Sequence, residues 1–66
     1  MTIVARDGLR FEAAKKGHTI TSLAAKVCLS RGHLTEIIHG AHTTAYTAGL
    51  IAKELGKTVE ELFYIT

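Results

Sequence analysis

The feature that most constrains this chain is a short break between two helix-like segments. From Ile20 to Val27 the apolar residues recur at the i, i+3, i+4, i+7 spacing of one helix face. A second apolar segment begins at Arg31, and only Cys28, Leu29 and Ser30 separate the two. Helices this short and this close in the chain cannot lie as a long antiparallel pair, so we expect them to cross at about 90–120°.

Glycine and hydroxyl residues divide the rest of the chain. A glycine follows each of three apolar-periodic segments, as it does after a helix, and no proline interrupts any of them. A threonine or serine precedes each later segment, as at a helix N-cap, and Glu61 stands three residues after Thr58, which completes a capping box. Alternation of period two is not sustained long enough to predict a strand. We expect five helices, within Ile3–Lys16, near Ile20–Val27, near Arg31–His39, about Ala45–Leu55 and about Val59–Tyr64.

These segments predict an all-α fold, a compact five-helix domain that covers residues 1–66 as a single unit. Sixty-six residues permit one domain with a small core. Helix two and helix three form the predicted corner. The residues that we expect to face inward are Leu9, Phe11, Ala13, Ile20, Leu23, Ala24, Val27, Leu29, Leu34, Ile37, Ile38, Ala48, Leu50, Ile51, Ala52 and Leu55.

Composition excludes several classes of protein. The single cysteine, Cys28, cannot form an internal disulfide, which fits a reducing compartment. No apolar run approaches the roughly 20 residues of a membrane span, and the first residues lack a secretion signal. We therefore expect a cytoplasmic protein with no membrane partner. The formal charge is +2 overall but +3 over residues 1–42, so a polyanion would be drawn to that part, although an ordinary solvated surface explains the same charges.

The stretch from Thr19 to Gly40, "TITSLAAKVCLSRGHLTEIIHG", resembles the helix-turn-helix of phage repressors and Cro proteins, the lambda-repressor-like or XRE family. The later "IAKELGKTVEELF", Ile51–Phe63, resembles the last two helices of that family, so the resemblance covers about residues 9–63. It implies a sequence-specific transcription regulator that binds a palindromic operator in double-stranded DNA as a homodimer. Such a protein acts at the nucleoid of a bacterial or phage-infected cell. Its helix three lies in the major groove.

The resemblance also assigns base readout to the residues just after the turn. Carried over, these are Arg31, Gly32, Thr35 and Glu36, with His33 on the outer side of the same turn. Arginine bonds guanine through O6 and N7, glutamate accepts from the cytosine amino group, and a threonine methyl contacts a thymine methyl. Gly32 has no side chain that could contact a base, so it would let the backbone of helix three approach the DNA closely. It costs the helix about 1 kcal/mol against alanine.

Contacts to the DNA phosphates are expected on both sides of helix three. Free backbone N–H groups at the starts of helices two and three favour anions, and the segment beyond helix three would meet the second backbone. The candidates are Thr19, Thr21, Ser30, His39, His42, Thr43, Thr44 and, more weakly, Lys26.

Two positions depart from the family pattern. Ile20 stands where the family commonly has a phosphate-bonding glutamine, and it cannot donate a hydrogen bond. Cys28 stands where the family usually has a glycine in a left-handed conformation, at a strain of about 1 kcal/mol if that conformation is kept.

Other functions remain open at this point. A helical protein-interaction module, such as an antirepressor or antitoxin component, would use helix three against protein, and Glu36 favours it because a carboxylate repels phosphate. RNA binding is disfavoured because the residues that would read bases include no aromatic side chain on which unpaired bases could stack. The histidines lack zinc-finger spacing and a second cysteine, so we expect no metal and no cofactor. Ser30 and His33 lack a third orienting group, so we expect no enzyme activity and no small-molecule substrate.

The C-terminal stretch Leu62–Ile65 is apolar for a chain end. One interpretation is that Leu62 and Ile65 close the core. The other is that Phe63, Tyr64 or Ile65 form a two-fold dimer contact.

Overall fold

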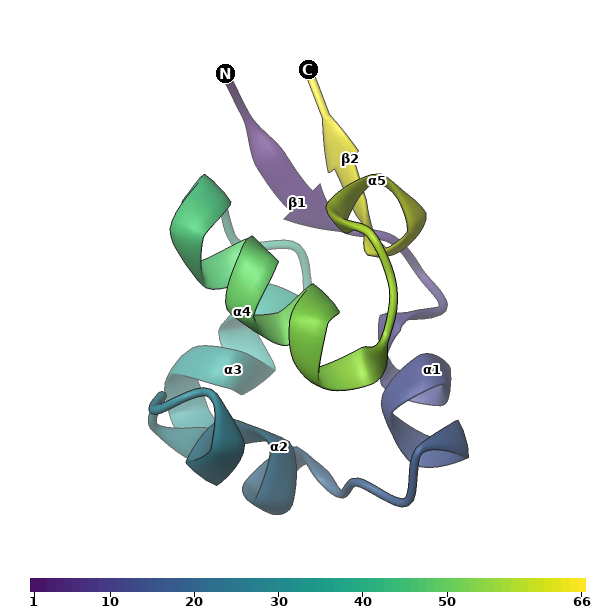
Figure 1. Cartoon of the computed structure of the whole chain (residues 1–66). Helices are drawn as coiled ribbons and strands as arrows, with labels where there is room; N and C mark the ends of the chain where they lie inside the picture. The colour runs from purple at the N-terminus through teal and green to yellow at the C-terminus, as the bar shows by residue number, and fades with distance from the viewer.

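The computed structural model describes all residues from 1 to 66 and contains five helices and two short strands (Figure 1). The five expected helices are confirmed, and the fold is mostly α. None of these helices has the length and apolar character that crossing a membrane requires. In chain order the elements are β1 (Ile3–Ala5), α1 (Leu9–Lys15), α2 (Ile20–Lys26), α3 (Arg31–Ile38), α4 (Ala45–Leu55), α5 (Val59–Leu62) and β2 (Phe63–Ile65).

Hydroxyl side chains begin four of the helices, as the sequence indicated. Each accepts a hydrogen bond from a backbone N–H in the first turn, which satisfies one of the donors that a helix start leaves free. The predicted capping box at Thr58 and Glu61 is present, and a second one joins Thr19 to Ser22. The four pairs are Thr19 with the N–H of Ser22, Ser30 with that of His33, Thr44 with that of Thr47 and Thr58 with that of Glu61.

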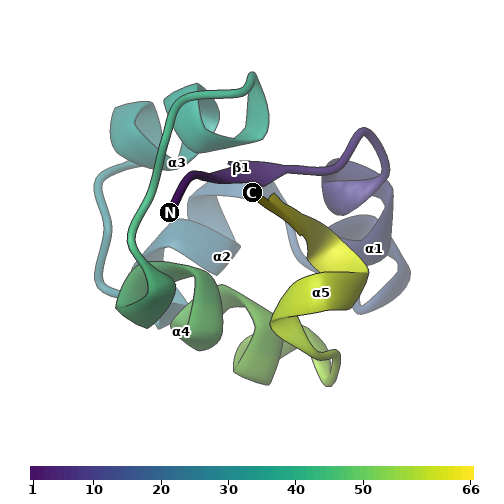
Figure 2. The ribbon, with the colours of Figure 1, turned by 90° about the horizontal axis from the view of Figure 1, so that it is seen from above.

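The strand pair is the main difference from the expected fold. β1 and β2 lie antiparallel with Val4 opposite Tyr64, so the two ends of the chain run side by side (Figures 1 and 2). The first helix was expected somewhere within Ile3–Lys16, and α1 occupies Leu9–Lys15 of that range, with β1 before it. The fifth helix ends at Leu62 rather than near Tyr64. Three residues are too few for strand alternation to show in a sequence, and the pairing joins opposite ends of the chain.

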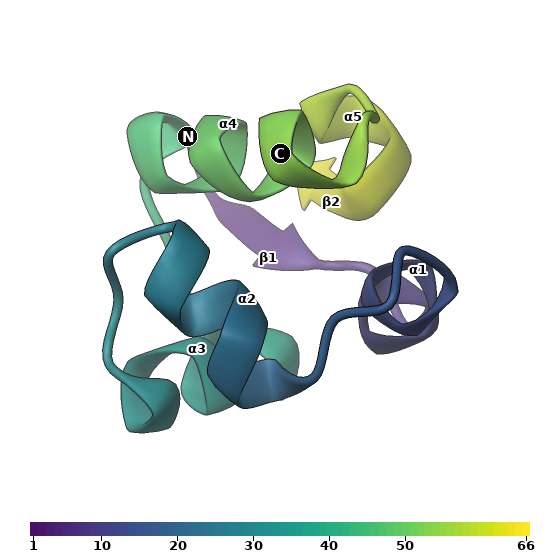
Figure 3. The same ribbon diagram turned by 60° about the horizontal axis from the view of Figure 1, so that its bottom comes forward.

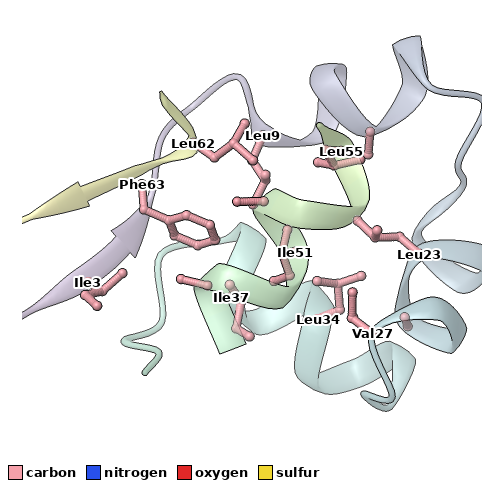
Figure 4. Close-up of a cluster of buried hydrophobic side chains, with 14 residues drawn as sticks. Ile3, Leu9, Leu23, Val27, Leu34, Ile37, Ile51, Leu55, Leu62 and Phe63 are labelled. Carbon is pink, nitrogen blue, oxygen red and sulfur yellow. The ribbon is translucent and has the colours of Figure 1, made fainter. Parts of the chain in front are cut away.

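One hydrophobic core joins all of these elements, and Figure 4 shows its side chains directed into a single cluster. Phe11 is not part of it: its side chain is 65% exposed on the outer side of α1. Four other expected members, Ile20, Leu29, Ile38 and Leu50, are only partly buried against the core. The buried residues are Ile3, Leu9, Ala13, Leu23, Ala24, Val27, Leu34, Ile37, Ala48, Ile51, Ala52, Leu55, Leu62 and Phe63.

The chain end divides between core and surface. Phe63 is 0% exposed, and Figure 4 shows its ring beside Ile3. The prediction of a dimer contact is therefore wrong for Phe63, because its ring is already enclosed by this chain. The next two residues, Tyr64 and Ile65, are 46% and 41% exposed. Leu62 closes the core as one interpretation had it, whereas Ile65 does not.

Candidate nucleic-acid interface

A tight turn sets the angle between α2 and α3. Cys28 has a φ of +60° and is the only residue other than glycine with a positive φ, so the left-handed conformation that is usual for the family at this position is kept. The backbone N–H of Leu29 donates to the carbonyl oxygen of Ala24 at 2.9 Å, and that of Cys28 donates to Ala25 at 3.4 Å. These two bonds form the closing pattern of a Schellman motif. The turn therefore ends α2 sharply and carries α3 across it (Figure 3).

The helix after the turn has one buried and one exposed side. Leu34 and Ile37 are fully buried under α3. At about 100° per residue, Gly32, Glu36 and His39 lie on the opposite side, and all three are exposed. Arg31 and Thr35 lie toward one edge of this exposed side, and His33 lies toward the other. We call the exposed side of α3 the reading face; it consists of Arg31, Gly32, His33, Thr35 and Glu36, and His39 follows it at the end of the helix.

The charged groups of the reading face are free to meet a partner. Neither Arg31 nor Glu36 takes part in any of the ion pairs of the chain. A Cβ added at Gly32 would meet no atom within 4 Å outside its own turns of helix, so no other part of the protein requires glycine there. The reading face thus presents a cation, an anion and a bare stretch of backbone within two turns of helix.

The expected phosphate contacts fall into two groups beside the reading face. Thr19, Thr21 and Ser30 are exposed at the starts of α2 and α3, and Lys26 is exposed at the end of α2. The second group follows α3, where the chain passes on to α4 (Figure 2). In this group His39, His42 and Thr44 are exposed, while Thr43 is half-buried.

The loop after α3 is held in place by the first strand. The backbone N–H of Thr43 donates to the carbonyl oxygen of Ile3 at 3.0 Å, which forms an isolated bridge beside the strand pair. This contact joins residues 40 positions apart, so no local pattern in the sequence indicated it. It fixes the loop that carries His42 and Thr44 relative to the core.

A second unpredicted contact supports the start of α2. The ring of His18 lies 3.1 Å from the hydroxyl oxygen of Ser22 through Nδ1 and 3.1 Å from a carboxylate oxygen of Glu54 through Nε2. His18 thereby ties the loop before α2 to the last part of α4. No local pattern in the sequence could pair His18 with Glu54, because the two residues are 36 positions apart.

A pocket of about 270 Å³ opens between α1, the start of α2 and one edge of α3. Arg10 on α1 and Arg31 on α3 both line it, together with Thr19 and Thr21. No pattern along the chain connects Arg10 with Arg31, because only the packing of α1 against α2 brings Arg10 to this pocket.

A comparison with protein families agrees with this geometry. A family model described as "Helix-turn-helix" matches residues 9–62. The matched range begins at the first residue of α1 and ends at the last residue of α5, so it contains the five helices and leaves out both strands. No curated protein and no solved structure matches the chain.

Proposed function

The chain belongs to the helix-turn-helix family of DNA-binding regulators, with a domain of the Cro and repressor kind, and from this we propose that it regulates transcription by binding a palindromic operator as a homodimer. Membership places DNA among its partners and sets it in a family of regulators rather than enzymes. The proposal adds sequence specificity of the phage repressor and Cro type. It also adds a place of action at the nucleoid of a bacterium or a phage-infected cell.

The observation that carries the proposal is the reading face. It stands on a helix that a Schellman turn holds across α2, and its arginine and glutamate have no partner within the protein. We assign Arg31 to a guanine, Glu36 to a cytosine amino group and the methyl group of Thr35 to a thymine. Gly32 lets the backbone of α3 approach the base pairs. His33 lies at the edge of the face, where it meets the rim of the groove.

Phosphate contacts then set the position of α3 in the major groove. On one side Thr19, Thr21 and Ser30 offer hydroxyl and backbone donors, with Lys26 more distant. On the other side His39, His42, Thr43 and Thr44 follow α3, and the bridge from Thr43 to Ile3 holds this segment still. Contacts on both sides of one helix suit a groove that is bounded by two phosphate backbones.

For the homodimer we propose a contact through the exposed end of β2. Tyr64 and Ile65 remain as candidates because both are partly exposed, whereas Phe63 is enclosed. A two-fold axis through this contact would place two copies of α3 in successive turns of the major groove, about 34–36 Å apart. The operator would then be a palindrome.

Selection of bound sequences from random duplex DNA tests the proposal. We expect enrichment of one palindromic site, bound about 10³-fold or more tightly than random duplex. Binding to random duplex should weaken steeply as salt increases. A selection that enriches no sequence contradicts the regulator proposal.

A protein-interaction module is the second candidate, and Glu36 is the observation that favours it. Its carboxylate is exposed and unpaired on the reading face, where it would repel a nearby phosphate. Replacement of Glu36 by glutamine distinguishes a DNA-binding regulator from a protein-interaction module. A regulator should change its preferred base at one operator position, whereas a protein module should bind random duplex more tightly without gaining any preference.

A further inference from the structure

The loop between α1 and α2 contains a histidine whose two ring nitrogens both have partners in the protein. The Nδ1 atom of His18 lies 3.1 Å from the hydroxyl oxygen of Ser22 on α2, and the Nε2 atom lies 3.1 Å from a carboxylate oxygen of Glu54 on α4. The His18 side chain is 14% exposed and that of Glu54 is 32% exposed. We call His18, Ser22 and Glu54 the clasp, because together they join the start of α2 to α4.

The hydroxyl group of Ser22 is placed so that it can serve either charge state of His18. Its oxygen accepts from the backbone N–H of Thr19 at 2.9 Å and lies 3.2 Å from the carbonyl oxygen of the same residue. When the ring is neutral with its proton on Nε2, Nε2 donates to Glu54 and Nδ1 accepts the hydroxyl hydrogen of Ser22. When the ring is protonated, Nδ1 donates to the Ser22 oxygen, and the hydroxyl hydrogen turns to the carbonyl of Thr19. No polar group of the clasp loses its partner in either state.

Protonation adds a charge pair to the contact with Glu54. A neutral ring gives this carboxylate a hydrogen bond, and a protonated ring adds the attraction of opposite charges at the same distance. Three cations oppose a charge on the ring. Arg10 on α1 and Arg31 on α3 line the pocket that His18 also lines, and Lys16 extends toward the end of α4. None of them has a hydrogen bond to the ring, whereas the carboxylate contacts it directly, so we expect the carboxylate to dominate.

His18 is also the histidine to which the fold can respond. The other three histidines, His33, His39 and His42, are exposed, and none of their side chains has a hydrogen bond or an ion pair. Histidine is the side chain whose charge ordinarily changes between about pH 5 and 8. A change of pH in this range therefore alters one contact between helices, the contact of His18 with Glu54.

We propose that the clasp fastens the helix-turn-helix to α4 in a proton-dependent way and holds it more tightly when His18 is protonated. The clasp holds α2, and α3 packs against α2, so the whole corner is attached through it. A group that binds its proton more tightly in the folded chain than in the unfolded chain stabilises the fold at the lower pH, and this contribution is lost as pH rises. The clasp acts on the fold, so it operates whether or not the reading face binds DNA.

The cost of removing the carboxylate at two pH values tests this proposal. Glu54→Gln keeps an oxygen that can accept from Nε2 but removes the charge. Urea unfolding of the wild type and the variant is measured at about pH 5.5 and about pH 8, toward the two ends of the range in which histidine titrates. We expect the substitution to raise the unfolding equilibrium constant by about fivefold more at the lower pH, since a hydrogen bond between charged groups contributes more stability than one with a neutral partner.

Glu60→Gln is the matched control. Glu60 is exposed and its carboxylate has no ion pair, so this variant removes the same charge away from the clasp. Its effect on unfolding should be equal at the two pH values. In a His18→Gln background, the pH dependence of the cost of Glu54→Gln should disappear.

Two results of the unfolding experiment overturn the clasp. One is a cost of Glu54→Gln that is equal at both pH values or larger at the higher pH. The other is the same pH dependence for Glu60→Gln, which assigns the effect to the overall charge of the protein. DNA binding is not the readout, so either result leaves the proposed function standing.

Nuclear magnetic resonance of the wild type gives a second readout that requires no variant to fold. Correlations between ring protons and ring nitrogens distinguish the two neutral tautomers of His18. We expect the proton on Nε2 at the higher pH, and a shift of the amide resonances of Ser22 and Glu54 as the ring takes up its second proton. A neutral ring with its proton on Nδ1 has no donor for Glu54, so that result overturns the proposal.

Discussion

The hydroxyl group of Thr35 donates a hydrogen bond to the backbone carbonyl oxygen of Arg31, with 2.8 Å between the two oxygens. Such a bond turns a threonine hydroxyl back onto its own helix. The methyl group is then the part of the Thr35 side chain that remains for a partner. The reading face of α3 therefore offers an apolar contact between the guanidinium of Arg31 and the carboxylate of Glu36.

Replacement of Arg31 by alanine should cost about 1–3 kcal/mol of binding free energy on the selected operator and relax selection at one base position. The reason is the loss of a paired contact to guanine. Competition binding with operators that differ at single positions measures both effects. An equal loss on every sequence would show that Arg31 contacts only phosphate.

Replacement of Gly32 by alanine should separate stability from binding. An added Cβ meets no atom within 4 Å outside its own turns of helix, and alanine is better than glycine inside a helix by up to about 1 kcal/mol. Urea unfolding should therefore show a more stable protein, while fluorescence anisotropy shows weaker operator binding because the methyl group holds α3 away from the bases. Unchanged affinity would mean that the backbone at Gly32 does not approach DNA.

Replacement of Cys28 by glycine should raise the free energy of unfolding by up to about 1 kcal/mol. A side chain at a φ of +60° is strained, and glycine relieves the strain at some cost in chain entropy. DNA affinity should be unchanged because the turn keeps its shape. A less stable variant would show that the thiol contributes packing that outweighs the strain.

Replacement of Phe63 should destabilise the fold, whereas replacement of Tyr64 should change the oligomeric state and leave the fold intact. Phe63→Ala removes a fully buried ring, which costs about 3–5 kcal/mol and leaves little of the stability of a small domain. Tyr64→Ser removes a half-exposed ring whose centroid lies 4.3 Å from the guanidinium carbon of Arg6, a contact worth about 0.5–1 kcal/mol. The Tyr64 variant should stay folded and sediment as a lighter species. A dimer of unchanged mass would move the interface elsewhere.

The capping box of α5 should make stability depend on acid pH. The backbone N–H of Thr58, and then its hydroxyl, donate to the Glu61 carboxylate and hold its pKa below the ordinary value of 4.5. A carboxyl group with a lowered folded pKa stabilises the protein above its unfolded pKa. That contribution is lost as pH falls through the lower folded value.

Urea unfolding at a series of pH values measures this effect, with Glu61→Gln as the control. Glutamine can still accept from Thr58 but does not titrate as glutamate does. The wild type should lose its advantage over the variant below pH 4.5. A difference that stays constant across that range would contradict the assignment.

The helices and the corner were predictable because their causes are local. Threonine and serine caps, the spacing of Leu23 and Val27, and the three-residue break lie within a few positions of what they determine. The conformation of Cys28 was left open: the resemblance marked only that the family usually has a left-handed glycine there, and the structure shows that Cys28 adopts it. The strand pair has no local cause: β1 gains its hydrogen bonds from a segment some 60 residues later, so the burial of Ile3 and Phe63 could not be read in advance.

In the candidate site too, the features with local causes were predictable and the contacts between distant segments were not. Helical periodicity sufficed to place Glu36 and His39 outward and Leu34 inward. The pocket that Arg10 and Arg31 both line, and the contact from His18 to Glu54, depend on how α1 and α4 pack against the corner. Such contacts between distant segments follow from the whole fold, and a pattern along the chain does not contain them.

The left-handed turn has a practical consequence for following this protein in solution. It leaves the thiol of Cys28 exposed at the corner beside α3, and this is the only cysteine of the chain. A nitroxide spin label can therefore be attached there without any substitution. In a two-fold dimer the two labels define a single distance, so electron paramagnetic resonance would track the separation of the two corners, with and without DNA, in the unaltered sequence.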